Sequence, residues 1–66
     1  MRGAMTNEQR HNEIIAWAVE QRAAVLVEMK SMDDPRQKRA ANDLARDLCT
    51  VRTKCELRIA FLRGIE

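Results

Sequence analysis

The stretch Ser31-Met32-Asp33-Asp34-Pro35 decides the fold, because it divides an otherwise helix-favouring chain into two halves of similar length. Proline fits the first position of a helix, where the amide that it lacks would have no partner, and Asp34 before it is a favourable N-cap. We therefore predict a helix from Pro35 to about residue 63, with Gly64 ending it. The connection of two to three residues predicts that the two helices lie antiparallel.

The first helix has an equally clear start in Thr6-Asn7-Glu8-Gln9. Thr followed three residues later by Gln forms a capping box, in which each side chain bonds the backbone amide of the other residue. Glu8 lies in the first turn, where the helix dipole favours a negative charge. We predict this helix over about residues 7–32. Residues 1–5 carry no pattern, so we expect a disordered segment or a cloning remnant there and one helical-hairpin domain over residues 6–66.

The composition excludes most other classes of protein. The chain has 66 residues, enough for one domain, and its two Gly, one Pro and two aromatic residues exclude a turn-rich β fold. Its longest apolar run, residues 14–19, is too short to span a membrane, and we expect no signal peptide, because no charged segment followed by an apolar one occurs near residue 1. Cys49 and Cys55 are too far apart along one helix for a disulfide, and two free thiols fit a reducing compartment. We expect a cytoplasmic, all-α protein.

The spacing of the apolar residues predicts more burial than one hairpin provides. In residues 35–63 they recur at steps of three and four, which gives one narrow stripe. In residues 7–32 they cover an arc of roughly 220°, whereas one neighbouring helix needs only about 100°. We therefore expect a homodimer in which two hairpins form a four-helix bundle. The residues predicted for the dimer or hairpin core are Ile15, Val19, Leu26, Met29, Leu44, Leu48, Val51, Cys55, Ile59 and Leu62.

Four apolar residues lie outside these stripes. Trp17 lies on the far side of the first helix, and the other three lie on the far side of the second. Trp anchors many protein interfaces, and apolar patches on small proteins usually mark contacts. Three interpretations stay open: a second subunit buries these residues, they bind another protein, or their exposure has no function. The predicted protein-binding residues are Trp17, Leu57, Phe61 and Ile65, with Arg58 and Arg10 at the rim.

Arg22 and His11 interrupt the apolar stripe of the first helix. A charged group there has to pair or reach water, so we expect Arg22 to reach an acidic residue such as Asp47, or to lie at a subunit seam. His11 is expected to be solvated, because a metal site needs further His or Cys ligands nearby. Cys55 is expected in the core and Cys49 at its edge. We predict no metal, no cofactor, no small-molecule substrate and no catalytic residues.

Charge is distributed unevenly along the chain. Residues 1–34 carry four basic and six acidic residues, whereas residues 35–66 carry eight basic and four acidic ones. A basic helix of this kind is a feature of nucleic-acid-binding proteins. Its basic residues point in several directions, however, and Arg39–Asp43 and Arg52–Glu56 are spaced as local ion pairs. The pattern therefore favours a protein partner over nucleic acid.

These features together predict a small protein-binding module, a dimeric regulator or inhibitor that docks on a larger protein and occludes it. In size and architecture the chain resembles small accessory proteins of phages and other mobile elements, and this resemblance implies a host protein as the target. The alternative is a small nucleic-acid-binding transcriptional regulator that uses the basic second helix. A third candidate is a purely structural assembly module.

Overall fold

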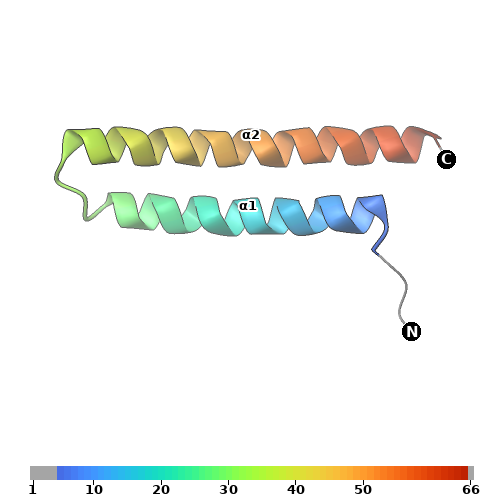
Figure 1. Ribbon diagram of the computed structural model, residues 1–66, viewed down its shortest axis with the longest axis horizontal. Coiled ribbons are helices and arrows are strands. Elements are labelled where there is room, and N and C mark those ends of the chain that lie inside the picture. The colour runs from blue at the N-terminus through green and yellow to red at the C-terminus, as the bar shows by residue number, and fades with distance from the viewer. Residues whose placement is uncertain (1–4, 66) are drawn as a thin grey trace.

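The protein is an antiparallel hairpin of two helices, α1 (Asn7–Met29) and α2 (Pro35–Ile65) (Figure 1). The computed structural model describes residues 5–65, with side chains for residues 5–64, and no strand occurs within this range. The start of α1 and the end of α2 lie together at the open end, opposite the connecting turn. The predicted all-α hairpin is confirmed. The expected disorder at the N-terminus, apart from Met5, falls outside the described residues.

The capping box at the start of α1 forms as predicted. Thr6 is extended, with φ −70° and ψ 162°, and its hydroxyl oxygen accepts a hydrogen bond of 3.1 Å from the Gln9 amide. The Gln9 side-chain oxygen accepts one of 2.9 Å from the Thr6 amide. Two of the amides that a helix start leaves unpaired are therefore satisfied within one turn.

The helix α1 ends at Met29, three residues before the predicted end. The amides of Lys30 and Ser31 each donate at 3.2 Å to the carbonyl three residues earlier, which tightens the last turn. The Ser31 hydroxyl also donates to the Glu28 carbonyl at 3.0 Å. Because Pro35 disfavours a helical conformation at the residue before it, the chain has to leave the helix before Asp34. The connection is therefore longer than the two to three residues predicted, covering residues 30–34.

The helix α2 begins as predicted and ends later. The Arg36 amide donates to the Asp34 carboxylate at 2.9 Å, so Asp34 is the N-cap before Pro35. The prediction that Gly64 ends the helix is wrong, since α2 runs through it to Ile65. A terminating Gly usually takes a positive φ, and no residue in the described range does so.

The core lies along one line between the helices and consists mostly of small side chains. The Ala residues at its centre let the two backbones approach closely. In α1 this line passes through Ala18 and Val25, and it is turned by about 90° from the expected line through Ile15, Val19 and Leu26, at about 100° per residue. The buried residues are Ala18, Val25, Ala41, Ala45, Leu48, Cys55 and Ile59.

The ten residues predicted for the dimer or hairpin core differ widely in burial. Leu48, Cys55 and Ile59 are buried within the hairpin. The half-buried ones are Ile15, Leu26, Met29 and Leu62. The exposed ones are Val19 and Leu44, each 48% exposed, and Val51, 37% exposed. The last three therefore lie outside the core of the single hairpin.

The hairpin forms a single layer of structure. Its Cα atoms extend 49 Å along the longest axis, 29 Å along the middle axis and 12 Å along the shortest, so the molecule is elongated and flat. Domains usually enclose a core between two layers. In agreement with this geometry, no large side chain in the described range is fully buried.

Candidate protein-binding surfaces

Exposed apolar side chains are the main feature of the surface. Trp17 is 53% exposed, Leu57 66% and Phe61 69%, so these three predicted binding residues point into solvent. Arg10 and Arg58 are also exposed, and the side chain of Ile65 lies outside the described part. The exposed large apolar residues are Met5, Ile14, Trp17, Val19, Val27, Leu44, Val51, Leu57 and Phe61.

The flat hairpin has two broad faces, one on each side of the plane that contains both helices. Each residue of a helix is turned by about 100° from the residue before it. Ala18 in α1 and Leu48 in α2 point at the other helix, so a residue rotated one way from them lies on one face and a residue rotated the other way lies on the opposite face. The Trp17 face carries Ile14, Trp17, Gln21, Glu28, Ala40, Leu44 and Val51. The Arg22 face carries Ile15, Val19, Arg22, Leu26, Ala45, Cys49 and Arg52.

The Trp17 face is the more apolar of the two. Ile14, Leu44 and Val51 are 38%, 48% and 37% exposed there, in addition to Trp17 itself. A shallow groove of about 290 Å³ crosses this face near the turn, between the two helices. It is lined by Val25, Glu28, Met32, Gln37, Ala40, Ala41 and Leu44. Glu28 is its only charged lining residue.

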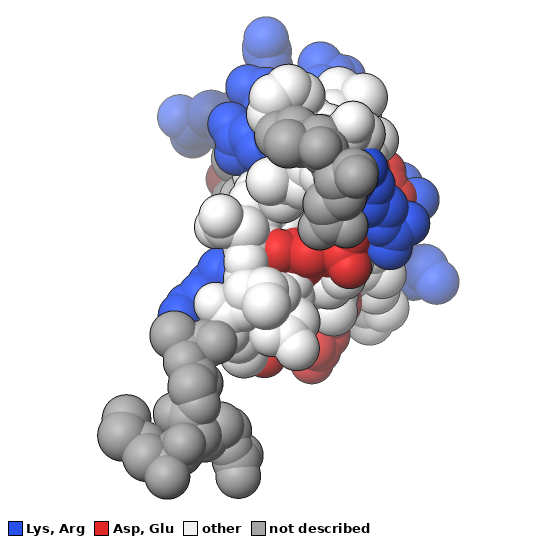
Figure 2. Space-filling model, turned by 90° about the vertical axis from the view of Figure 1, so that its right-hand side faces the viewer, with Lys and Arg blue, Asp and Glu red and all other residues white. Residues whose placement is uncertain are grey.

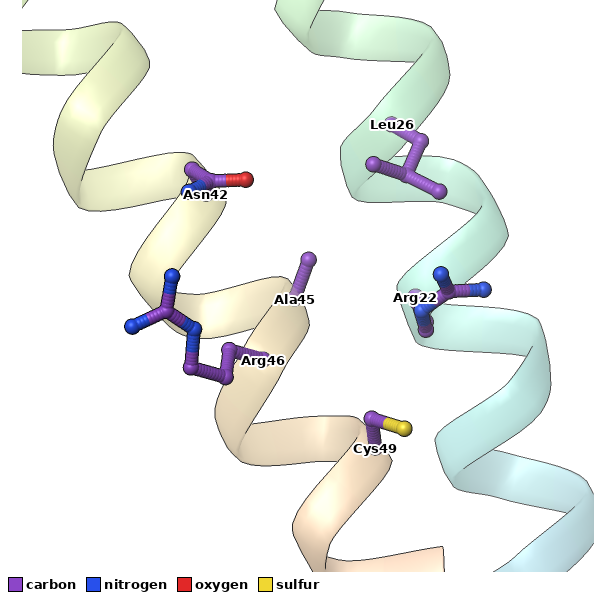
Figure 3. A pocket seen from close by; sticks show the side chains of 6 residues that line it. All are labelled: Arg22, Leu26, Asn42, Ala45, Arg46 and Cys49. Atoms are coloured by element: carbon purple, nitrogen blue, oxygen red, sulfur yellow. The ribbon is translucent and has the colours of Figure 1, made fainter.

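The Arg22 face is basic. Two grooves on this face are lined in part by Arg22, Arg46 and Arg52, and neither lining includes an acidic residue, although Arg52 is paired with Glu56. Figure 3 shows one of these grooves, where Arg22 and Leu26 of α1 lie across from Asn42, Ala45 and Cys49 of α2. The guanidinium group of Arg46 points away from α1 (Figure 3). The two faces therefore differ in charge as well as in apolar area.

The expected ion pair between Arg22 and Asp47 does not form among the described residues. Asp47 lies about 100° from Leu48, towards the Trp17 face, whereas Arg22 is turned towards the opposite face. The rotation of α1 away from its expected orientation explains the error. Arg22 is exposed and reaches water from the edge of the core.

Two ion pairs occur in the described range. Arg52 and Glu56 pair at 3.4 Å, as their spacing predicted, whereas the expected pair of Arg39 and Asp43 is not formed there. Arg63 donates to the Glu8 carboxylate at 2.8 Å and joins the two helices at the open end. Figure 2 views the hairpin from this end and shows acidic atoms next to basic ones.

Sequence reasoning missed the pair of Glu8 and Arg63, although the antiparallel arrangement contained the signal. In such a hairpin, residues near the start of the first helix lie beside residues near the end of the second helix. A carboxylate in the first turn of α1 therefore lies near a basic residue in the last turn of α2. The pair fixes which residues of the two helices are level, although exposed pairs contribute little stability.

His11 and the two cysteines take simple structural positions. His11 is half-buried, and its Nδ1 lies 2.6 Å from the Asn7 carbonyl oxygen, one turn earlier. Cys55 is buried in the core, as expected, and Cys49, which was expected at the edge of the core, is exposed on the Arg22 face. Among the described residues, no three His, Cys, Asp or Glu side chains gather as a metal-binding group.

Comparison of the chain with protein-family models, with curated proteins and with solved structures finds no match. In the described range, neither helix combines the length and the apolar character needed to cross a membrane. The surfaces of the hairpin are therefore the basis for a functional proposal.

Proposed function

We propose that this chain is a protein-binding module that works as a homodimer. Two hairpins pack into a four-helix bundle, and the dimer docks on a larger protein and occludes part of its surface. In this role it acts as a regulator or inhibitor, in the manner of the small accessory proteins of mobile elements. The observation that carries the proposal is the excess of exposed over buried large apolar side chains.

The size of the exposed surface supports a second layer. The solvent-accessible surface is 5595 Å², whereas a compact monomer of 7.6 kDa exposes about 4,300 Å². The excess is about 1,300 Å², and a standard interface buries roughly 800 Å² on each partner. Covering one face of the hairpin with a second copy would remove a large part of this excess, although not all of it.

The partner protein takes a different part of the surface. Leu57 lies about 180° from Leu48, on the side of α2 that faces away from α1, and so it stays exposed when either broad face is covered. Phe61 follows one turn later and lies at the border with the Trp17 face. Two adjacent large apolar residues on one helix, four positions apart, fit an apolar groove of another protein.

Sedimentation equilibrium at micromolar concentration tests the dimer. We expect a mass of twice the 7.6 kDa of one chain. A well-folded monomer at these concentrations would show that the open face needs no second copy, and it would overturn the dimeric part of the proposal.

Nucleic-acid binding is the second candidate, and the basic Arg22 face is the observation that favours it. Three arginines line grooves there without an acidic neighbour among the lining residues. Phosphate contacts give an affinity that falls steeply as salt increases. We expect no sub-micromolar binding to duplex DNA or RNA at physiological ionic strength; such binding, with a steep salt dependence, would favour this candidate over the protein-binding module.

A further inference from the structure

We infer that the second copy packs on the Trp17 face with the two hairpins running in opposite directions, so that the turn of one lies over the open end of the other. This inference rests on the proposed dimer and specifies its interface. It places Arg10 near Glu28 of the second copy and Arg58 near Asp47 of the second copy. Each of these contacts occurs twice, because a twofold axis relates the copies.

The distribution of apolar residues selects the Trp17 face. Four of the exposed large apolar side chains lie on it: Ile14, Trp17, Leu44 and Val51. On the Arg22 face, Val19 is the one member of that set. Burial of apolar area is the main source of association free energy in such interfaces. Contact between two Trp17 faces therefore gives a more favourable free energy of association than contact between two Arg22 faces.

Charge selects the same face. An isologous interface brings each face against itself, and the Arg22 face is net basic there, because Glu56 offsets only Arg52 among the three arginines that line its grooves. On the Trp17 face basic and acidic residues occur in similar numbers. The basic ones at its borders are Arg10, Arg36, Lys54 and Arg58, and the acidic ones are Glu13, Glu20, Glu28, Asp43 and Asp47.

These charges are also separated along the length of the hairpin. Arg10 and Arg58 belong to the half near the open end, whereas Glu28 and Asp47 belong to the half near the turn. All four side chains are exposed, and none forms an ion pair within the described part of the chain. The half of the Trp17 face near the open end is therefore net basic, although it also holds Glu13, and the half near the turn is net acidic, although it also holds Arg36.

Two twofold arrangements bury this face, and the separation of charge distinguishes them. An axis parallel to the helices places the two open ends together, with α1 of each copy over α2 of the other. Arg10 of one copy then lies near Arg58 of the second copy, so two basic residues meet. An axis across the helices, within the interface, places the open end of one copy over the turn of the other. Because like charges repel and opposite charges attract, the second arrangement is favoured.

The register of the hairpin allows both predicted contacts at once. Midway between Arg10 and Glu28 is position 19 of α1, and midway between Arg58 and Asp47 is the junction of positions 52 and 53 of α2. The ion pair shows that Glu8 of α1 is level with Arg63 of α2. Because the helices are antiparallel, position 19, eleven residues after Glu8, is level with position 52, eleven residues before Arg63. Val19 and Arg52 indeed line one groove. A single axis at this level therefore satisfies both contacts.

Charge reversal tests the arrangement through the monomer–dimer equilibrium of the full chain, measured by sedimentation at low salt. Arg58→Asp and Asp47→Arg each replace two attractive contacts by two repulsive ones, and we expect each to weaken the dimer about tenfold. The double variant restores the pairing in reverse and should recover most of the affinity. An equimolar mixture of the two single variants should form a heterodimer in preference to either homodimer, because one copy then carries both carboxylates and the other both guanidinium groups.

Arg46→Asp is the matched control, since it makes the same change of charge at an exposed position outside the Trp17 face, and the dimer should keep its affinity. If Arg58→Asp strengthens the dimer, the parallel arrangement is correct, because that change relieves repulsion between two basic ends. If Arg58→Asp behaves like Arg46→Asp, or the mixture forms no heterodimer, the proposed interface is wrong while the dimer stands. A monomeric parent chain at micromolar concentration overturns the proposed dimer and this interface together.

Discussion

Small side chains control the distance between the two helices at the level of single residues. Ala18 of α1 is 1% exposed, and Ala41 and Ala45 of α2 are 8% and 4% exposed, so three methyl groups occupy the centre of the contact. Leu48 is the largest buried residue beside them, at 7% exposure. In a core with so few large side chains, each one contributes a large share of the apolar burial.

Leu48→Ala should therefore lower the free energy of unfolding by about 2–3 kcal/mol, through lost apolar burial and the cavity that remains. Leu57→Ala removes the same atoms from a side chain that is 66% exposed, and it should change stability by no more than about 0.5 kcal/mol. Urea denaturation followed by circular dichroism measures both. Equal effects of the two variants would place the core elsewhere than between Ala18 and Leu48.

At the scale of the helices, stability depends on how each end is closed. The start of α1 is held by the reciprocal bonds of Thr6 and Gln9, and the start of α2 by the Asp34 carboxylate. The C-terminal end of α2 differs, because Gly64 is helical and a Cβ atom built on it would meet nothing within 4 Å. Its glycine is therefore not required by the backbone conformation.

Gly64→Ala should stabilise the protein by up to about 1 kcal/mol, because Ala has the higher helix propensity and the added methyl group meets open space. A terminating glycine in the left-handed conformation would give the opposite sign, since a Cβ is unfavourable there. Thermal denaturation of the single variant distinguishes the two outcomes. A lowered melting temperature would show that α2 ends at Gly64 in solution, as the sequence alone suggested.

The same helices show which features a sequence reveals. The N-terminal caps were predictable because Thr6, Gln9 and Asp34 bond backbone amides within three residues, so no tertiary information is needed. The orientation of α1 was not predictable, because an apolar arc of roughly 220° offers several lines for one partner helix. In the structure the line of Ala18 faces α2, and Ala18 is buried whereas the larger Ile15 is only half-buried.

The candidate surface divides in the same way. That Trp17, Leu57 and Phe61 point away from the hairpin core followed from helical periodicity alone. The exposure of Leu44 and Val51 could not be predicted in this way. A stripe of apolar residues in the sequence does not show which members contact the neighbouring helix and which remain exposed for another contact. The contrast between a basic and a mixed face also needed the relative rotation of both helices.

At the scale of the whole molecule, a single layer of helices has no enclosed interior, so the side chains on both broad faces contact solvent. In the proposed dimer, a second copy on the Trp17 face would cover Ile14, Leu44 and Val51, which are exposed in the single hairpin, and would supply the second layer that a bundle requires. Leu57 and the basic Arg22 face stay on the outside of that bundle. The proposed dimer would therefore present two copies of each outer surface to the proposed larger partner, which would allow two linked contacts.

Trp17 is the only tryptophan of the chain, so its fluorescence reports directly on the proposed interface. In the single hairpin the indole is 53% exposed, and a water-exposed indole emits at longer wavelength than one in an apolar environment. As the protein concentration is raised through the monomer–dimer transition, the emission maximum should move to shorter wavelength, in step with the mass measured by sedimentation. Leu57→Ala should leave this shift unchanged, whereas Arg58→Asp should move it to about tenfold higher concentration. A dimer that forms without any change in emission would place Trp17 outside the subunit interface and leave it free to bind the partner protein.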